Sequence, residues 1–367
     1  MTVSQQLPLS GLRVLDLTRV LAGPLATMML GDLGADVIKI ERPVSGDETR
    51  GWGPPFDARG ESAYFLSINR NKLSIAADLA NPDDRDVIAE LIRGADVVVD
   101  NFRPGALARA GLDPERFIER RPELIWCTIT GFGLESARPG YDFVVQAERG
   151  WMAITGDPDG APTKAGVALA DVVAGKDAAI AVLAALVARG RTGKGGRVVT
   201  SLAHSATAAL VNVAQNALVS GKEATRWGNA HPNLVPYEAF AARDRQVVIA
   251  VGSDAQWSAC ARALGLDELA ADGTLATNAG RLLARDRVCA AIARRVRQED
   301  AGHWCALLDR VGVPCGVVKG VRESLREVNA SPLTGVWPEA PATVRRPPPR
   351  LDEHGAEIRR RGWETFA

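Results

Sequence analysis

Residues 9–43 read LSGLRVLDLTRVLAGPLATMMLGDLGADVIKIERP. Two apolar runs, VLDL at 14–17 and ADVIKIE at 35–41, have the composition of short strands buried in a sheet. Between them, Pro24 lies in the first turn of an amphipathic pattern that ends at Gly34, which is typical of a helix. The stretch therefore predicts a strand, a helix and a second, parallel strand joined by a right-handed crossover.

The pattern continues towards the C-terminus. Further apolar runs follow at 95–102, 124–133 and 197–202, and the segment from about 170 to 190 predicts a long, nearly all-apolar and buried helix. This alternation predicts the α/β class, with a Rossmann-like parallel sheet. In such a sheet, ligands bind beyond the carboxyl ends of the strands, which here are residues 18–24, 41–43, 101–104 and 131 onward.

The length of the chain and the positions of its loop-forming segments predict two domains. A chain of 367 residues is long for one core. We predict a large domain over 1–200, a linker over 201–226 that includes one helix at 205–220, and a smaller α/β domain over 227–322. Residues 323–367 are expected to return to the large domain as an extended, proline-rich tail.

The composition excludes several classes of protein. Lys plus Arg and Asp plus Glu are both 44, so no global field attracts nucleic acid or an anionic membrane. No window reaches the roughly 18 apolar residues needed to span a bilayer, and the start MTVSQQLPLSGL has no leader-like pattern, so a cytoplasmic enzyme is expected. Five cysteines without a CxxC pair argue against a disulfide framework and a zinc site.

Two common kinds of catalytic site lack their sequence signals. The four histidines show no HxxxH spacing, so neither metal ligation nor a His-based triad is supported. The loop after the first strand reads TRVLAGP and contains neither GxGxxG nor GxxxxGK[ST]. A dinucleotide cofactor is therefore not predicted, although the fold resembles those that bind one.

Basic and amide side chains follow the strand ends instead. Arg42 follows the second run, Asn101 and Arg103 follow the third, and Arg109 lies one helical turn further on. Because a guanidinium binds phosphate oxygens in a planar fork, these residues could clamp a phosphorylated ligand. Each one taken alone could equally be an ordinary surface charge.

These segments also resemble a known family. The stretch 9–43, SINRNKLSI, DNFRPGAL, ITGFG, GYDFV, ALADVVAG, TGKG and RRPPPRLDEH occur in the order and at the spacing of the family III CoA-transferases. The resemblance covers nearly the whole chain and implies an enzyme that uses a coenzyme A thioester as substrate, with no further cofactor. It also implies a homodimer of two interlocked chains.

The resemblance assigns residues to roles. Asp171 matches the family nucleophile. The positions matching the family's coenzyme A contacts are Val20, Leu21, Ala22, Arg42, Ala77, Leu79, Asn101, Phe102, Arg103, Arg109 and Tyr141. Two positions depart from the pattern: Ala80 stands where members carry a lysine, and VGSDAQW (251–257) stands where some have a glycine-rich loop.

The role of Asp171 has a simpler alternative. A carboxylate can attack a thioester to give a mixed anhydride, which free coenzyme A opens to an aspartyl thioester. Asp171 also stands at the start of the predicted helix, where an ordinary N-cap is expected, and the amides of that helix could stabilise an oxyanion.

Two other functions remain open beside CoA transfer between carboxylic acids. The family's racemases carry a histidine where this chain has Tyr141, and a phenol is a poor base for an α-proton, so racemisation of a 2-methylacyl-CoA is disfavoured. A non-catalytic coenzyme A-binding protein is the third interpretation.

The acyl site is predicted from weaker signals. The motifs are most similar to succinyl-CoA-dependent dicarboxylate transferases, which implies a dicarboxylate donor and acceptor. Arg19 is the candidate cation for the second carboxylate, with Arg50 and Arg70 as alternatives. The other candidates for this pocket are Trp52, Tyr64, Gly252 and Gln256.

Overall fold

The computed structural model describes residues 6–367 and divides them into two compact units. The first consists of residues 6–152, 164–222 and 325–367, and the second of 153–163 and 223–324. Residues 1–5 lie outside this range. They belong to the predicted large domain and to the N-terminal segment in which a leader pattern was sought. Residues 153–163, which the sequence placed in the large domain, pack with the second unit.

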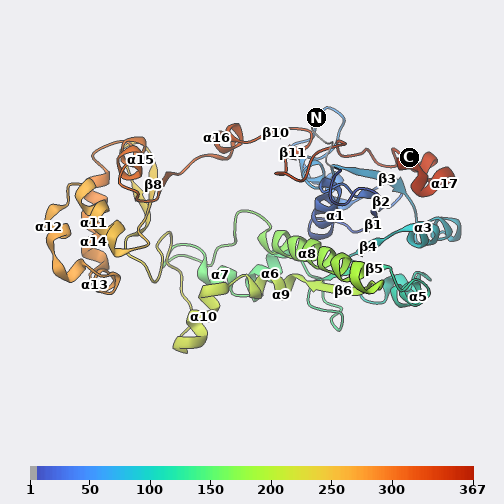
Figure 1. Ribbon diagram of the computed structural model, residues 1–367, viewed down its shortest axis with the longest axis horizontal. Coiled ribbons are helices and arrows are strands. Elements are labelled where there is room, and N and C mark those ends of the chain that lie inside the picture. Colours follow the sequence, from blue (N-terminus) through green and yellow to red (C-terminus); the bar gives the residue numbers. More distant parts are fainter. Residues whose placement is uncertain (1–5) are drawn as a thin grey trace. The chain divides into compact units, whose positions relative to one another are not determined.

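The first unit is built on a six-stranded parallel sheet in the order β3-β2-β1-β4-β5-β6 (Figure 1). Its strands are β1 (Arg13–Leu17), β2 (Asp36–Glu41), β3 (Lys72–Ala76), β4 (Val97–Asp100), β5 (Ile125–Thr130) and β6 (Gly196–Ser201). The predicted α/β class with a parallel sheet is confirmed. The sequence had missed β3.

Helices cover both faces of this sheet. One apolar core joins it to α1 (Ala22–Asp32), α6 (Asp142–Glu148), α8 (Leu169–Thr192) and α9 (Leu202–Ala208). The core on the other face includes α3 (Pro82–Gly94), α4 (Ala106–Arg109), α17 (Gly355–Arg361) and the 3-10 helix η4 (Gly362–Phe366), with α5 (Pro114–Arg120) packed at its edge. The chain reverses direction across the sheet between β1 and β4, so the loops after these two strands flank the crevice where such folds bind ligands.

Two sequence expectations about helices are wrong. The segment expected as one helix at 205–220 forms α9 and α10 (Val211–Ser220), with Val211 in a left-handed conformation at φ 43°. Helix α8 is not buried all round within the single chain, because Ile180 is 62% exposed and Val187 64% exposed. Its inner face is lined by small residues, and a Cβ on Gly175 would lie 2.6 Å from the carbonyl oxygen of Ala22.

The remaining elements of the first unit are short. They are α2 (Ala63–Leu66), α7 (Trp151–Ile154, which runs into the second unit), the 3-10 helices η1 (Glu48–Gly51) and η3 (Leu325–Glu327), and the two-residue strands β10 (Ala330–Ser331) and β11 (Gly335–Val336). Residues of the C-terminal segment lie along the free edge of β3: Asp352 Oδ1 accepts from the Ala76 amide at 2.8 Å, and the His354 amide donates to Ser74 O at 3.0 Å.

The second unit pairs an antiparallel sheet with helices. Its strands are β7 (Tyr237–Ala241), β8 (Gln246–Ala250) and β9 (Cys315–Val317). Its helices are α11 (Asp254–Ala263), α12 (Asp267–Ala271), α13 (Asn278–Leu283), α14 (Arg285–Val296), α15 (Ala301–Asp309) and α16 (Val321–Ser324), with η2 (Gly273–Leu275).

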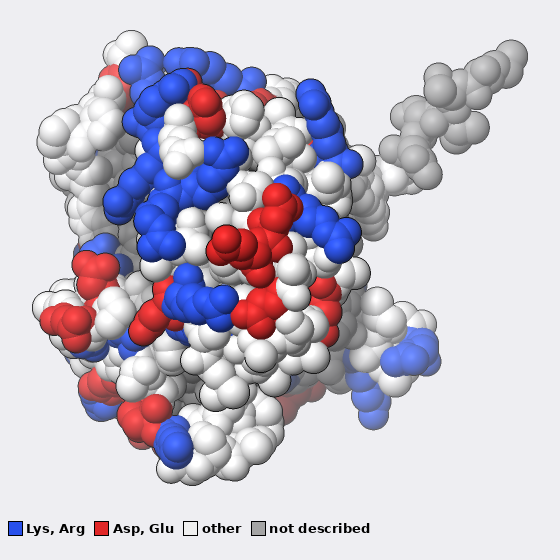
Figure 2. Space-filling view, turned by 90° about the vertical axis from the view of Figure 1, so that its left-hand side faces the viewer, with Lys and Arg blue, Asp and Glu red and all other residues white. Residues whose placement is uncertain are grey.

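Figure 2 shows Lys and Arg side chains gathered over one part of the visible face and Asp and Glu beside them, so this face is mixed in charge. Within residues 6–367, no helix combines the length and apolarity needed to cross a bilayer.

Charged side chains lie inside the sheet of the first unit. Asp16 of β1 and Lys39 of β2 are register partners, and both are fully buried. Lys72 of β3 reaches Asp16 with a 2.9 Å Nζ–Oδ2 contact, while Lys39 pairs with Asp47 at 3.1 Å. Desolvation alone would raise the pKa of Asp16, but the charges of Lys72 and Lys39 and the Thr18 hydroxyl hold it well below its usual range.

We predict that Asp16→Asn destabilises the protein by about 3 to 5 kcal/mol, because it leaves the buried ammonium group of Lys72 without its anion. Urea unfolding measures the loss. The exposed pair of Arg93 and Glu90 is the control, and Glu90→Gln should cost less than about 1 kcal/mol. A loss below about 1 kcal/mol in Asp16→Asn would show that the buried pair is dispensable.

Candidate active site

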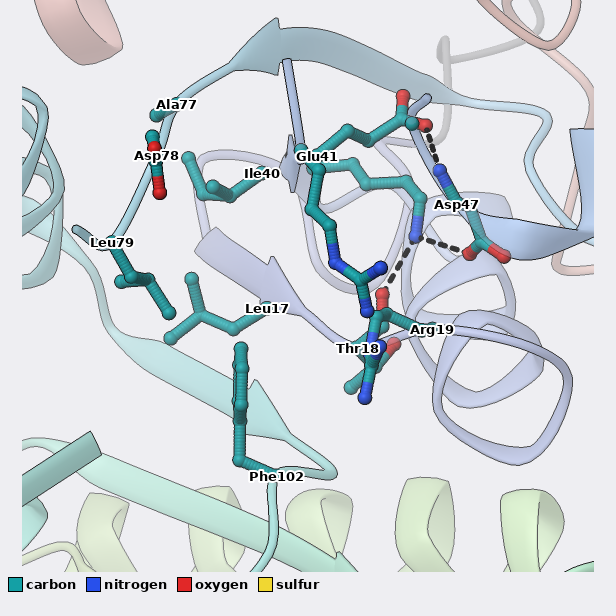
Figure 3. A pocket seen from close by; sticks show the side chains of 13 residues that line it. Leu17, Thr18, Arg19, Ile40, Glu41, Asp47, Ala77, Asp78, Leu79 and Phe102 are labelled. Carbon is teal, nitrogen blue, oxygen red and sulfur yellow. Dashed lines mark hydrogen bonds and ion pairs between the residues drawn. The ribbon is translucent and has the colours of Figure 1, made fainter. Parts of the chain in front are cut away.

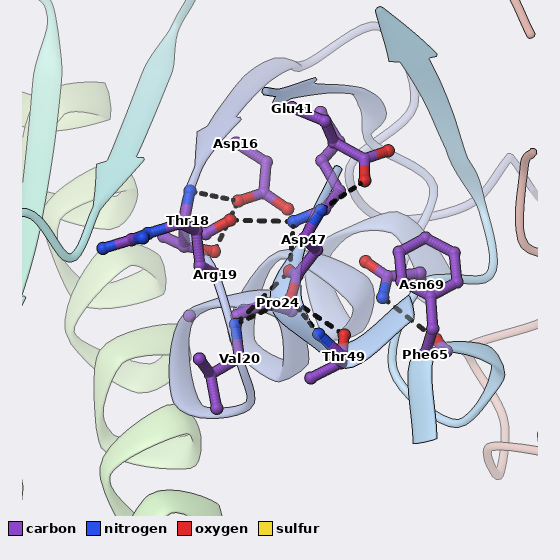
Figure 4. Close-up of polar contacts among 12 residues, drawn as sticks. Asp16, Thr18, Arg19, Val20, Pro24, Glu41, Asp47, Thr49, Phe65 and Asn69 are labelled. Atoms are coloured by element: carbon purple, nitrogen blue, oxygen red, sulfur yellow. Dashed lines mark hydrogen bonds and ion pairs between the residues drawn. The ribbon is translucent and has the colours of Figure 1, made fainter. Parts of the chain in front are cut away.

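The loop after β1 is held by side chains from three neighbouring strands and loops (Figure 4). Lys39 Nζ donates to the Thr18 carbonyl oxygen at 2.8 Å. The Asn101 side chain accepts from the Arg19 amide at 3.0 Å and donates to the Arg19 carbonyl at 2.8 Å. The Val20 amide donates to Asp47 Oδ1 at 3.2 Å. These contacts fix Val20 at φ 72°, a conformation that a β-branched residue rarely adopts.

Asp171 is the third residue of α8, whose N-cap is Ala168, so the expectation that Asp171 caps this helix is wrong. The amides at the start of α8 are satisfied by Asp142 of α6, whose Oδ1 accepts from Ala170 at 2.8 Å and from Asp171 at 3.4 Å. Gln146, one turn further along α6, donates to the second oxygen of Asp142 at 2.8 Å. A side chain from a different helix therefore orients the helix turn that carries Asp171.

The Asp171 carboxylate has an unusual electrostatic setting. Burial, and secondarily the negative charge of Asp142, raise the pKa of Asp171 to about 7. No side chain or amide within residues 6–367 donates a hydrogen bond to its carboxylate oxygens. Burial, together with the charges of Asp171, Asp142 and Asp47, raises the pKa of Tyr64 to about 12, which keeps this phenol neutral near the carboxylates. Asp171 is thus an unpaired carboxylate in a partly desolvated place.

Asp171 lines a cavity of about 350 Å³, here called the Asp171 pocket. The loop after β1 forms one wall and the loop after β4 another. Eight residues predicted from the sequence line it beside Asp171: Arg19, Val20, Leu21, Ala22, Asn101, Phe102, Arg103 and Tyr141.

A second cavity of about 150 Å³, here called the Leu79 pocket, lies at the ends of β1, β2 and β3. Apolar side chains of Leu17, Leu79 and Phe102 face one another across it (Figure 3). Its lining contains the predicted residues Arg42 and Ala77 as well. Arg19 and Phe102 line both cavities, so the two pockets adjoin at these side chains.

Other predicted residues lie outside both linings. Arg109 is exposed in α4, with a guanidinium nitrogen 3.1 Å from where a Cβ on Gly105 would lie. Trp52 is 42% exposed and meets Tyr64 edge to face at 5.1 Å between ring centroids. Gly252 and Gln256 belong to the second unit, where Gln256 Oε1 accepts from the Gly252 amide at 2.9 Å.

The two alternatives to Arg19 as the cation for a substrate carboxylate are already paired. Arg50 binds Glu41 and Glu61, both at 2.7 Å. Arg70 binds Asp32 at 2.7 Å. Each guanidinium is nearly buried in these contacts and is therefore a structural cation in this unit.

The sequence did not single out Asp142, Gln146, Glu48 or Arg138. Asp142 directly follows Tyr141 in the GYDFV motif, so its place beside a predicted site residue was a usable signal. Glu48 and Arg138 line the Asp171 pocket, but Glu48 begins the short 3-10 helix η1 and Arg138 lies in a loop, and neither segment has a periodic pattern. The sequence predicted no metal site because its histidines lack the spacing of metal ligands. Within residues 6–367, no three His, Cys, Asp or Glu side chains lie together as metal ligands would.

Comparison with known proteins gives one consistent result. Residues 9–361 match CoA-transferase family III. The chain is 44% identical over 323 residues to succinyl-CoA:glutarate CoA-transferase of Mus musculus, covering 87% of this chain and 74% of the relative. It is 40% identical to succinate–glutarate CoA-transferase of Agrobacterium fabrum, covering 96% of this chain and 94% of the relative.

The structure is similar to solved ones as well. The crystal structure of a CaiB/BaiF family protein from Brucella suis is 40% identical, with a TM-score of 0.85, and the match covers 97% of this chain and 99% of that one. Sequence and fold thus agree over nearly the full length, and the chain belongs to CoA-transferase family III.

Proposed function

We propose that this enzyme transfers coenzyme A from succinyl-CoA to a dicarboxylate such as glutarate, by way of a covalent intermediate on Asp171. The observation that carries the proposal is the unpaired carboxylate of Asp171 in a pocket walled by the loops after β1 and β4. The names of the relatives in mouse and Agrobacterium fabrum support the choice of substrates. Coenzyme A enters as a substrate, and the proposal needs no further cofactor.

The chemistry runs through two covalent forms of Asp171. Its carboxylate attacks the thioester carbonyl, the C–S bond breaks, and coenzyme A thiolate leaves a mixed anhydride. The thiolate then attacks the aspartyl carbonyl, which releases the donor acid and forms an aspartyl thioester. The acceptor carboxylate takes the same steps in reverse and leaves as its CoA ester, which restores Asp171.

The oxyanion formed in each attack needs hydrogen-bond donors. The expected donors, the amides at the start of α8, are occupied by Asp142. The first amides of α1 have no partner within their own helix, and Leu21 and Ala22 line the Asp171 pocket. We therefore assign the oxyanion site to the start of α1, where the positive end of the helix dipole adds to the effect.

The proposal includes a homodimer, as the family resemblance implies. Apolar side chains on α8 and α10 support it, because Ile180, Val187, Leu218 and Val219 are each more than 60% exposed in the single chain. Exposed apolar residues on two helices of the same unit are typical of an interface.

The substrates can be identified by incubating the enzyme and succinyl-CoA with a panel of carboxylates and identifying the new CoA esters by mass spectrometry. We expect dicarboxylates, glutarate among them, to be accepted ahead of monocarboxylates. Enzyme-dependent α-deuterium incorporation into a 2-methylacyl-CoA in deuterated water, without CoA exchange, would support the racemase alternative instead.

Asp171→Asn should lower kcat by on the order of 10³-fold or more while CoA affinity stays near that of the wild type, because an amide fills the same space but is a poor nucleophile. Quenching the wild type with succinyl-CoA and trapping with hydroxylamine should label the peptide that contains Asp171. Retained activity in the Asn variant together with an unlabelled peptide contradicts the mechanism.

The same variant has a stability signature. A carboxyl group whose pKa is raised by folding favours the folded state below its ordinary pKa, and this contribution is lost as pH rises through about 7. Asp171→Asn should therefore raise the Tm more at pH 8 than at pH 5, which also shows that the variant is folded.

Turnover should rise with pH through about 7, because only the ionised form of Asp171 attacks. Asp142→Asn removes the neighbouring charge while its amide oxygen can still accept from Ala170, so the midpoint of the pH–rate profile should move to lower pH. Burial, the larger cause, remains, so the midpoint should stay above that of a free aspartate. An unchanged midpoint would show that Asp142 acts only as a cap.

A further inference from the structure

Glu48 lies where the two pockets adjoin and binds two arginines with one oxygen. Its Oε1 is 2.6 Å from Arg19 Nη1 and 2.9 Å from Arg42 Nη2. Arg19 lines both pockets, Arg42 lines the Leu79 pocket, and Glu48 lines the Asp171 pocket. A ligand that extends from one pocket into the other therefore passes Arg19, which both other side chains contact.

The hydrogen-bonding capacity of this cluster is not filled. Glu48 Oε2 and Arg19 Nε are buried and have no hydrogen-bond partner among the residues described. Two guanidinium groups offer several N–H donors in fixed planes, and one carboxylate oxygen uses only two of them. A phosphate group, which presents more oxygens, would satisfy more of these donors.

The backbone around Glu48 is anchored by its buried neighbours, whereas its side chain is held only by the two arginines. Asp47 and Thr49 on either side are buried, and Asp47 Oδ1 accepts from both the amide and the hydroxyl of Thr49 at 3.0 and 2.8 Å. Asp47 is also the partner of Lys39 inside the sheet. The Glu48 side chain is 35% exposed, so it can rotate away from the arginines without moving the loop.

We infer that Glu48 occupies the position of a coenzyme A phosphate in the ligand-free enzyme and is displaced when coenzyme A binds. The inference rests on the proposed binding of coenzyme A across the two pockets. Glu48 keeps Arg19 and Arg42 from repelling each other and holds them in place for the phosphate. Because it competes with the ligand, it also weakens coenzyme A binding and speeds product release.

The test compares Glu48→Gln with the wild type by isothermal titration with coenzyme A at low ionic strength. The variant should bind coenzyme A about five- to tenfold more tightly, and this gain should shrink in high salt because it is electrostatic. Glu364→Gln is the matched control: Glu364 forms an exposed pair with Arg13 at 3.0 Å away from both pockets, so the same change in net charge should leave the affinity unchanged.

Two further ligands identify the anion. Pantetheine, which lacks phosphate, should bind Glu48→Gln and wild type equally. A lowered KM for glutarate with unchanged coenzyme A affinity would mean that Glu48 stands in for a substrate carboxylate, which overturns the inference.

The inference and the proposed function fail differently. If the wild type does not bind coenzyme A, the proposed function is wrong. If the wild type binds it and Glu48→Gln binds it equally or less well, Glu48 is a support for the arginines and the inference is wrong.

Discussion

The ion pairs buried at the ends of β1, β2 and β3 determine the geometry of everything around the first loop. Asp16 is shared by Lys72 and by the Thr18 and Thr27 hydroxyls, while Lys39 spans from the Thr18 carbonyl to Asp47. Charges without water are costly unless each finds its partners, so the network tolerates few alternative arrangements. Its rigidity explains how the loop can hold Val20 in a strained conformation.

The site combines the rigid loop after β1 with the carboxylate of Asp171, which is positioned in a different way. Asp171 is held through its backbone, by the Asp142 cap at the start of α8, and its own oxygens are left without partners. The same Asp142 oxygens also oppose ionisation of Asp171. One side chain therefore sets both the position and the protonation of the proposed nucleophile, and the energetic cost of the unpaired carboxylate is borne by the surrounding fold.

The sequence predicted the strands that carry strong apolar runs, since β1, β2, β4, β5 and β6 all coincide with such runs. It missed β3 because Lys72 and Ser74 interrupt its apolar pattern. Most residues predicted at the strand ends line the two pockets, because the order of elements in a parallel sheet fixes where strand ends meet. The position of Asp142 beside Tyr141 pointed to the site, but its contact with α8 and the contact of Glu48 with Arg19 could not be derived, because each depends on how far a side chain extends between elements distant in sequence. A signal did exist for the ion network: Asp16 and Lys39 stand inside apolar strand runs, where charges are expected to be paired.

The covering of β3 by residues 352–354 has a consequence for the order of biosynthesis. β3 is an edge strand, and the groups at its open side are satisfied by a segment that lies near the end of the chain. On the ribosome, residues 223–324 can complete their own core before residues 325–367 emerge, but the N-terminal sheet cannot, because its core includes Ile358 and Trp363. A nascent chain thus carries an unprotected strand edge until residues 352–354 have emerged, which makes this edge the place where a chain truncated before them would self-associate.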